Sequence, residues 1–570
     1  MDRQLKHDVL ILGAGLAGLR AAVELSRRTG GKVDIGIVSK VQLMRAHSVC
    51  AEGGTAAVMR TDLGDSTELH AWDTVKGSDF LADQDVVRTF VEAMPREIRQ
   101  LDHWGIPWTR TADGHIDQRP FGGHSYPRAT LAADKTGFFE MQTLYDQLQR
   151  YDSFTRYDEL FITDVVVADG RFQALVGLDA TSGETVALQA KALLIASGGG
   201  GTLHGFTTYS QTVTGDGMAM AYRAGLPLED MEFLQFHPTG LVPSGILMTE
   251  GCRGEGGYLV NAKGERFMQA YAPSKMELAP RDMVSRAEMM EIEAGRGYAR
   301  EDGLDFLHLD LRHLGADRIN QRLPLIREVC IKFLGVDPIE QPIPIRPVAH
   351  YSMGGVECDI TGRTRLPNVW AAGEASCVSL HGANRLGSNS TGECLVFGAI
   401  CGEQIAKALP ALGPAEASAP ALAAAEDRIA AVLARTGDEN LYKLRTELRT
   451  LMDKHVGVFR TGEGLSAALA GIRELRARVA RAPVLDKSKV YNSNLIHAFE
   501  LENLVDLCEV TVAGALARQE SRGAHARRDF TTRDDDQWMK HTLAYRTEGG
   551  PRLEYKPVVA DMWKPVERKY

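Results

Sequence analysis

A glycine-rich turn between an apolar strand and a helix opens the chain and constrains its fold more than any other feature. Residues 7–12 (HDVLIL) are typical of a buried strand, residues 19–28 have helical spacing, and a second strand is expected at 33–38. Between them, Gly13, Gly15 and Gly18 occupy the positions at which a nucleotide-binding turn lets its backbone approach a pyrophosphate. The sequence therefore predicts an α/β fold that begins with a dinucleotide-binding βαβ unit.

Two further strand ends rich in glycine follow later in the chain, at residues 192–201 (ALLIASGGGG) and 368–375 (NVWAAGEA). The second strand of the βαβ unit ends in Ser39 and Lys40, not in the acid that takes a ribose hydroxyl in the simple fingerprint. Glu374, after the third glycine-rich strand, is placed where a carboxylate meets a ribose. Three such strand ends fit one long ligand, so we predict FAD as the cofactor and not a nicotinamide dinucleotide.

The length of 570 residues calls for several domains. We expect an FAD-binding Rossmann-like domain in two parts, 1–233 and 352–418, with an inserted α+β capping domain at 234–351. An Ala/Pro-rich stretch at 411–428 is typical of a linker, and the helical spacing after it predicts a helical domain at 419–532. The polar and aromatic segment 533–570 is predicted to be extended and docked.

Charge and cysteine usage exclude several classes of function. The net charge of −10 comes without a basic block, which argues against nucleic acid as a partner. The eight cysteines are scattered without a CxxC pair, which favours a reducing compartment and predicts no metal site in this chain. We find no signal peptide and no apolar run near the roughly 20 residues that cross a bilayer, so membrane contact is expected only through a partner.

Polar and cationic side chains stand inside glycine-rich turns in the second half of the chain. The segments are HPTG (237–240), MTEGCRGEGG (248–257), APRDMVSR (279–286), HYSMGG (350–355) and HGANRLGSNS (381–390). Arginine presents a planar fork that matches a carboxylate, and histidines with a threonine hydroxyl suit a second clamp. This combination predicts a site for a small dicarboxylate.

These segments, together with AHSVCAEGG (46–54), PFGG (120–123), AADKTG (132–137) and ESRGAHAR (520–527), resemble the flavoprotein subunit of the succinate dehydrogenase and fumarate reductase family. The resemblance runs from residue 7 to about residue 545. It implies an FAD-dependent oxidoreductase that interconverts succinate and fumarate. It also implies that His47 is joined covalently to the flavin.

The resemblance assigns roles to further residues of this chain. It implies that Arg281 is the proton donor, with Glu250 and Arg253 as its relay to solvent. It implies that the dicarboxylate is held by His237, Thr249, Glu250, His350 and Arg385, with Phe121 packing over it. The positions expected around FAD are Gly13, Gly15, Gly18, Ser39, Lys40, His47, Gly53, Gly54, Gly198, Gly199, Asp216, Glu374, Arg385, Ser388 and Ser390.

An arginine acid has a consequence for pH dependence. A guanidinium with a pKa above ~12 is a poor general acid, but a carbanion beside a carboxylate is basic enough to take its proton. In the reverse direction the guanidine must first be neutral, so succinate oxidation is expected to be favoured at alkaline pH. Glu52 stands where similar fumarate reductases often carry Glu, which favours the reductase direction.

Some positions depart from the family pattern. Ala46 and Ser48 flank His47 where many relatives have Ser and Thr, and this change is small enough to leave the covalent bond expected. Thr391 and Gly392 follow the SNS sequence where a bulkier apolar residue is common, which predicts looser packing beside the flavin.

The scattered cysteines give electrons no exit through this chain, so the resemblance implies an iron–sulfur protein subunit as the docking partner. It further implies a membrane anchor that carries quinone, with this subunit peripheral on the cytoplasmic face of the inner or plasma membrane. A soluble L-aspartate oxidase shares the dicarboxylate motifs and is the main alternative. An NAD(P)H reductase would need a second complete βαβ fingerprint, and a scaffolding protein has no supporting feature.

Overall fold

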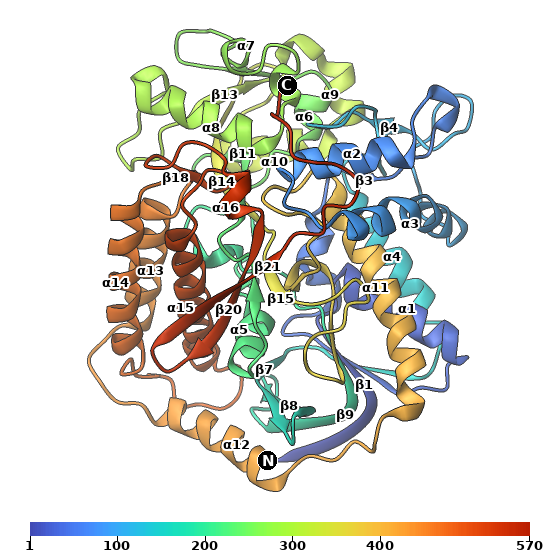
Figure 1. Ribbon diagram of the computed structural model, residues 1–570, viewed down its shortest axis with the longest axis vertical. Helices are drawn as coiled ribbons and strands as arrows, with labels where there is room; N and C mark the ends of the chain where they lie inside the picture. The colour runs from blue at the N-terminus through green and yellow to red at the C-terminus, as the bar shows by residue number, and fades with distance from the viewer. Residues whose placement is uncertain (570) are drawn as a thin grey trace.

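A seven-stranded sheet organises the computed structural model, which describes residues 1–569 (Figure 1). Strands β6, β2, β1, β9 and β16 are parallel, and β7, β8 and β9 continue the sheet in antiparallel fashion. In spatial order the strands are β6 (Phe154–Tyr157), β2 (Ile35–Val38), β1 (Arg3–Leu12), β9 (Thr185–Ile195), β8 (Arg171–Asp179) and β7 (Leu160–Ala168), with β16 (Val369–Ala371) also paired to β9. The predicted βαβ start and α/β class are confirmed.

Two helices cover one face of this sheet and lie side by side (Figure 1). Helix α1 (Leu16–Thr29) follows the glycine turn, and α11 (Asn389–Ala408) follows the third glycine-rich strand. Glycines in α11 allow the close approach, since a Cβ at Gly398 would lie 2.7 Å from the Ala17 carbonyl oxygen. Segments almost 400 residues apart in sequence therefore form one layer of the nucleotide-binding fold.

Helix α11 is long and apolar, although no continuous apolar run was expected in the chain. Within residues 1–569, one helical stretch, Asn389–Ala411, is long and apolar enough to cross a bilayer by length and composition. Glycine, serine and threonine interrupt its apolar residues, so the sequence shows no long apolar run there. The helix packs against α1 and α3 (Gln84–His103) in the protein core.

The remaining helices around the sheet are α2 (Thr67–Gly77), which packs on α3, α4 (Thr136–Leu148), which packs on α1, and α5 (Asp216–Arg223). A small antiparallel sheet of β3 (Thr55–Ala56), β5 (Ala129–Thr130) and β4 (Gln118–Arg119) lies beside them. Strand β3 contacts α11, so this small sheet adjoins the start of that helix.

The inserted segment forms its own sheet and its own core. The strand order is β11 (Leu234–Leu241), β14 (Ile343–Ser352), β13 (Leu307–Asp310) and β12 (Tyr258–Val260). The helices on it are α6 (Gly251–Gly254), α7 (Met268–Tyr271), α8 (Arg281–Glu291), α9 (Ala316–Arg322) and α10 (Pro324–Leu334). Because β11 and β14 are paired neighbours, the chain leaves and rejoins the FAD-binding part at one place. The boundaries at 234 and 351 stay predictions.

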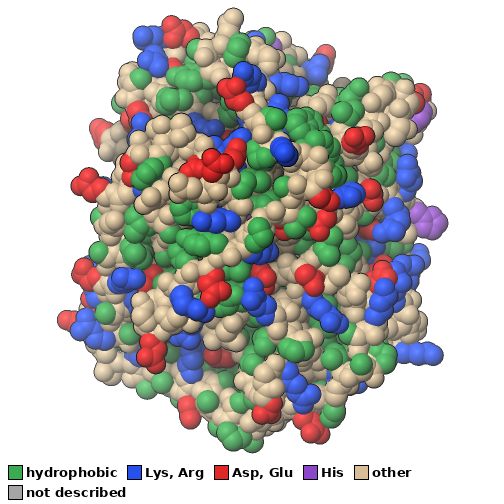
Figure 2. Space-filling view, in the orientation of Figure 1, with side chains coloured by type: hydrophobic (Ala, Val, Ile, Leu, Met, Phe, Trp, Pro, Cys, Tyr) green, Lys and Arg blue, Asp and Glu red, His purple; other side chains and the backbone are tan. Residues whose placement is uncertain are grey.

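The C-terminal third packs beside the main sheet (Figure 1). Its helices are α12 (Ala419–Ala434), α13 (Leu441–His455), α14 (Gly462–Val479) and α15 (Ser493–Ala517), and their apolar residues share one core with β7, β8 and β9. The predicted helical region is therefore present, while its limits at 419 and 532 stay predictions. On the face in Figure 2, acidic and basic side chains are interspersed.

The last segment is more ordered than the sequence indicated. After α16 (Asp535–Trp538), strands β20 (Lys540–Thr547) and β21 (Gly550–Pro557) form a hairpin. Strand β20 pairs with β10 (Leu228–Glu229), and the sheet continues through β15 (Gly355–Glu357) to β17 (Ser376–Cys377). The hairpin thus ties the C-terminal segment to the two strands that flank the inserted domain.

Candidate active site

A cavity of about 540 Å³ extends from the glycine turn after β1 to helix α8 of the inserted domain. Nearly every residue assigned from the sequence lines it: Gly13, Gly15, Ser39, Lys40, His47, Gly53, Gly54, Phe121, Gly198, Gly199, Asp216, His237, Thr249, Glu250, Arg281, His350, Glu374, Arg385, Ser388 and Ser390. Two assigned residues, Gly18 and Arg253, lie outside the lining. The fold thus brings positions from many separate segments, between Gly13 and Ser390, to one cavity.

The glycine turn has a backbone that a side chain would disrupt. Gly13 has a φ of +115°, and a Cβ there would lie 2.2 Å from the Ala196 carbonyl oxygen at the end of β9. Gly18 acts differently, because a Cβ there would lie 2.1 Å from the Gly13 carbonyl oxygen, so its role is to let α1 pack on the turn. Leu16 and Ala17, at the N-terminus of α1, line the cavity, and the start of a helix favours a negatively charged group such as a pyrophosphate.

Several buried polar atoms in the lining have no hydrogen-bond partner within residues 1–569. They are His47 Nδ1, Glu52 Oε2, Ser197 Oγ, His237 Nε2, Arg385 Nε and Ser388 Oγ. Buried polar atoms are normally paired, so unpaired ones around a cavity indicate that a polar ligand pairs with them. Their spread from the glycine turn to the inserted domain fits an elongated cofactor such as FAD.

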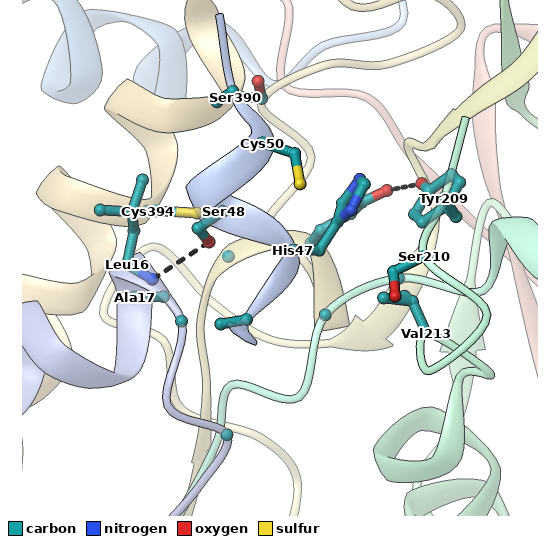
Figure 3. Close-up of a pocket in the computed structure, with 18 of the residues that line it drawn as sticks. Leu16, Ala17, His47, Ser48, Cys50, Tyr209, Ser210, Val213, Ser390 and Cys394 are labelled. Carbon is teal, nitrogen blue, oxygen red and sulfur yellow. Dashed lines mark hydrogen bonds between the residues drawn. The ribbon is translucent and has the colours of Figure 1, made fainter. Parts of the chain in front are cut away.

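His47 lies on the wall of this cavity, on a 3₁₀ turn (His47–Cys50) (Figure 3). Its ring stacks on that of Tyr209, with centroids 5.1 Å apart and planes inclined by 14°. Burial lowers the pKa of His47 to about 4, so the imidazole is neutral near pH 7 and keeps a nitrogen lone pair. The serine beside it, Ser48, accepts a hydrogen bond from the Leu16 backbone N–H, which fixes the turn to α1.

Lys40 and Glu374, the two charged residues considered for the ribose, both line the cavity. The Lys40 Nζ lies 2.7 Å from Asp216 Oδ2 and 2.9 Å from Glu500 Oε1, so two carboxylates hold this ammonium. The Ser352 backbone N–H donates to Glu374 Oε1 at 2.9 Å, and the Tyr209 hydroxyl also donates to Glu374. Burial raises the pKa of Glu374 to about 7.

Arg281 and Glu250 form the centre of the end of the cavity that adjoins α8. Arg281 starts α8, and its Nε donates to Glu250 Oε2 at 2.6 Å while its Nη1 donates to Gln235 Oε1 at 3.0 Å. The Gly122 backbone N–H donates to the other Glu250 oxygen at 2.6 Å. Arg253 Nη2 lies 3.7 Å from Glu250 Oε1, so Glu250 bridges two arginines.

Burial and charge set the protonation states of this cluster. Burial lowers the pKa of Arg281 to about 9, against the pull of the Glu250 carboxylate. Burial by itself would raise the pKa of Glu250, but the charges of Arg281 and Arg253 hold this pKa below its ordinary value. Burial and the nearby arginines hold the pKa values of His237 and His350 well below the ordinary range. Near neutral pH, this end of the cavity therefore combines an ionised acid, a guanidinium with a lowered pKa and two neutral imidazoles.

Arg385 and the two histidines face the same end. The rings of His237 and His350 lie 4.9 Å apart edge to face, and His350 Nδ1 lies 2.9 Å from the Thr208 hydroxyl. Arg385 donates from Nη1 to Ser390 Oγ at 3.1 Å and lies 4.4 Å over the Tyr351 ring. Its Nε has no partner among the described residues, which leaves a donor for an anion.

Four supporting residues were not assigned from the sequence. Gln235 orients Arg281 and also donates to the Arg385 carbonyl, Thr208 holds His350, Tyr351 lies under Arg385, and Tyr209 stacks on His47. Gln235 lies two residues before the HPTG motif and Tyr351 lies inside the HYSMGG motif, so proximity to a motif was an available signal. Nothing in the local sequence marks Thr208 or Tyr209.

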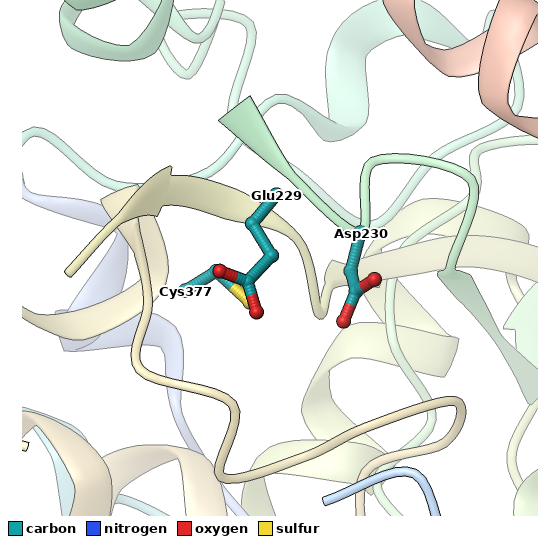
Figure 4. Close-up of side chains that lie close together, drawn as sticks. All are labelled: Glu229, Asp230 and Cys377. Carbon is teal, nitrogen blue, oxygen red and sulfur yellow. The ribbon is translucent and has the colours of Figure 1, made fainter. Parts of the chain in front are cut away.

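One group of buried acids lies outside this cavity. Oxygens of Glu229 and Asp230 come together with the Cys377 thiol in an arrangement that resembles a metal site (Figure 4). Positive charge is already present there, because Lys556 Nζ lies 2.8 Å from Glu229 Oε2 and His541 Nδ1 lies 2.6 Å from Asp230 Oδ2. A lysine and a histidine from the C-terminal hairpin therefore balance these carboxylates.

Comparison with known proteins gives the same family over the whole chain. A family model for an FAD binding domain matches residues 8–391, and one for the fumarate reductase flavoprotein C-terminus matches residues 445–570. A fumarate reductase flavoprotein subunit of Serratia sp. is 45% identical, with 99% of this chain and 96% of that protein covered. A succinate dehydrogenase flavoprotein subunit of Rickettsia bellii is 41% identical, with 97% and 95% covered.

A solved structure of a variant of E. coli quinol fumarate reductase superposes with a TM-score of 0.96 at 43% identity, with 99% of each chain covered. These relatives agree with the resemblance and not with the L-aspartate oxidase alternative. The chain belongs to the fumarate reductase and succinate dehydrogenase flavoprotein family, whose members are FAD-dependent oxidoreductases.

Proposed function

We propose that this chain is the catalytic flavoprotein subunit of a succinate:quinone oxidoreductase and that it interconverts fumarate and succinate in the cavity described above. The observation that carries the proposal is the Arg281–Glu250 contact of 2.6 Å, set between Arg385, His237 and His350 at one end of that cavity. FAD, when bound, supplies the hydride-transfer chemistry. The residues of the chain bind the diacid, orient it and handle its proton.

The two ends of the diacid have separate clamps. Arg385 offers a guanidinium with an unpaired Nε, and His350 is fixed beside it by Thr208. His237 and Thr249 supply donors for the other carboxylate, in line with the roles that the resemblance implies. Guanidinium-to-carboxylate hydrogen bonds are among the stronger ones in proteins, so Arg385 contributes most to orientation.

Arg281 delivers the proton that the reduction of fumarate requires. With a pKa of about 9 it is protonated at neutral pH, yet it loses its proton far more readily than an arginine in water. Glu250 lies against its Nε, and Arg253 adjoins the other oxygen of the same carboxylate, so a proton returns along these groups. In succinate oxidation the same path runs in reverse, from a neutral Arg281.

His47 is proposed as the covalent tether of FAD. The support is its place on the cavity wall, its unpaired Nδ1 and a pKa of about 4, which keeps a neutral, nucleophilic imidazole available. Tyr209 stacks on the ring and fixes its plane.

The proposed complex supplies the partners of this chain. One similar solved structure is a quinol-fumarate reductase with menaquinol molecules, which covers 99% of this chain with a TM-score of 0.95. We propose an iron–sulfur subunit as the direct partner and a membrane anchor with quinone behind it. The chain then lies peripherally at the cytoplasmic side of the inner or plasma membrane.

The physiological direction is proposed to be fumarate reduction. Glu52 lines the cavity next to Gly53, at the position that favoured this direction in the sequence.

Dye-coupled assays of both directions on one purified sample test the proposed function of the chain. Fumarate reduction and succinate oxidation with FAD bound support it, whereas turnover of L-aspartate but not of succinate contradicts it.

A further inference from the structure

The unusual Thr391 at the start of α11 takes part in a short hydrogen-bonded chain. Thr391 lines the cavity, and its hydroxyl lies 2.7 Å from the Thr55 hydroxyl on β3. The Thr55 hydroxyl in turn lies 2.5 Å from Glu140 Oε1 on α4. The sequence predicted only looser packing at this position. The structure instead shows a polar link from the cavity wall to a buried carboxyl group.

Glu140 has no charge partner. Its side chain is fully buried, and its second oxygen, Oε2, has no hydrogen-bond partner within residues 1–569. Burial raises the pKa of Glu140 to about 7, against the opposing effect of the Thr55 hydrogen bond. The group therefore changes charge in the physiological range, although no step of the proposed reaction uses it.

The other titratable groups near α4 do not neutralise Glu140. The buried or adjacent ones on the neighbouring elements are Arg20 and Glu24 on α1, Glu97 on α3, His47 and Cys50 on the 3₁₀ turn, and Glu393 and Cys394 on α11. Arg20, the only cation among them, is engaged by Glu24 and Glu97 at 3.0 and 2.8 Å. Neutralisation of Glu140 therefore comes from a proton.

The protonation state of Glu140 determines the direction of the hydrogen-bonded chain. An ionised Glu140 only accepts, so Thr55 donates to it and the Thr391 hydroxyl donates to Thr55. A protonated Glu140 can donate to Thr55, which frees the Thr391 proton to point into the cavity. Both the charge and the hydroxyl dipoles thus change together at the cavity wall.

We propose that Glu140 is a positioning residue whose charge, acting through Thr55 and Thr391, sets how readily the group bound in the cavity is reduced. The proposal rests on the proposed FAD site. Adding electrons to a group in the cavity makes it more negative, so an ionised carboxylate nearby opposes reduction and a protonated one does not. The reduction potential should therefore fall more steeply with pH where Glu140 ionises.

Spectroelectrochemical titration of the bound flavin from about pH 5 to about pH 9 tests this in the purified full chain. Glu140→Gln keeps an acceptor for Thr55 but cannot ionise. Below about pH 6 we expect the variant and the parent to have the same potential. Above about pH 8, at equal applied potential, we expect the variant to hold about tenfold more reduced flavin relative to oxidised, which corresponds to ~30 mV for a two-electron couple.

Two further variants separate the proposed role from a structural one. Thr391→Val keeps Glu140 but breaks the chain, so its potential at alkaline pH should lie above that of the parent, in the same direction as Glu140→Gln. Glu288→Gln is the matched control, because Glu288 is also a fully buried carboxyl group without a hydrogen-bond partner among the described residues, and it does not line the cavity. Its potential should follow the parent at every pH.

Identical curves for the parent and Glu140→Gln would overturn the inference while leaving the proposed function intact. An equal shift in Glu288→Gln would also overturn it, since the effect would then be unspecific. A purified parent that cannot bind FAD would overturn both the inference and the proposed function. If Glu140→Gln does not fold, the Thr391→Val variant alone tests the inference: a potential above that of the parent at alkaline pH supports it, and a potential equal to or below that of the parent overturns it.

Discussion

At the scale of residues, Arg281 shows how burial alters a side chain that is rarely titrated. Desolvation and the neighbouring Arg385 and Arg253 make the guanidinium easier to deprotonate, while Glu250 at 2.6 Å keeps its proton in place. An arginine in this setting is a usable acid because its pKa of about 9 approaches the working pH.

The pH dependence of the two directions follows from this pKa. Succinate oxidation needs neutral Arg281, so its rate should rise with pH up to about 9. Fumarate reduction needs the protonated form, so its rate should fall as pH increases above about 9. Dye-coupled rates in both directions check the prediction. A succinate oxidation rate that stays flat between about pH 6 and about pH 9, with chemistry limiting, would count against it.

His47 carries the second residue-scale prediction. We expect His47→Ser to bind FAD without a covalent bond, to keep fumarate reduction and to lose most succinate oxidation. The tether raises the oxidising power of the flavin, and a rise of order 100 mV supplies ~5 kcal/mol for a two-electron couple. Flavin fluorescence of the denatured gel band and the two dye-coupled rates are the measurements. Equal losses in both directions would contradict this role.

At the scale of elements, the glycine turn after β1 is the most specific local structure. Gly13→Ala should lose FAD and destabilise the turn by about 1–3 kcal/mol, because a Cβ would meet the Ala196 carbonyl at 2.2 Å and the φ of +115° is unfavourable for alanine. FAD content after purification and the melting temperature measure both effects.

Gly30→Ala is the matched control for this turn. Gly30 ends α1 with a φ of +61°, but a Cβ there would meet nothing within 4 Å. It should lose some stability and keep its FAD. If Gly13→Ala retained FAD as well as Gly30→Ala does, the turn would not approach the cofactor as proposed.

Features that depend on local sequence could be predicted, whereas features that depend on contacts between distant segments could not. The βαβ start, the inserted domain and the helical region follow local patterns, and the predicted elements are present. The hairpin of β20 and β21 was missed because its first strand is defined by pairing with β10, about 310 residues earlier. In the site, Arg281 and Glu250 lie in dense motifs, whereas Thr208, Tyr209 and the chain from Thr391 to Glu140 depend on contacts between distant segments.

At the scale of the whole molecule, buried charges fasten the C-terminal hairpin to the rest of the protein. His541 contacts Asp230 and Asp83, and Lys556 contacts Glu229. Despite burial, the Asp230 and Glu229 carboxylates raise the pKa of His541 to about 10, so this histidine is charged in the folded protein. The hairpin therefore closes the fold through ion pairs as well as strand pairing.

His541→Gln should destabilise the protein at about pH 6, since leaving buried acids without a partner costs about 3–5 kcal/mol. The folded pKa lies above the ordinary value of 6.5, so this stabilisation is complete below pH 6.5 and is lost as pH rises toward about 10. The melting temperatures of the parent and the variant should therefore differ at about pH 6 and converge as the pH rises toward about 10. A difference independent of pH would contradict the assignment of charge to His541.

The most direct test of the whole account is the rate of Arg281→Gln, measured per bound flavin. We expect it to bind FAD and fumarate but to reduce fumarate roughly 10²–10⁴-fold more slowly than the parent, with a similar loss in succinate oxidation, because it cannot transfer the proton. A variant that contains FAD and turns over within tenfold of the parent would contradict the central claim.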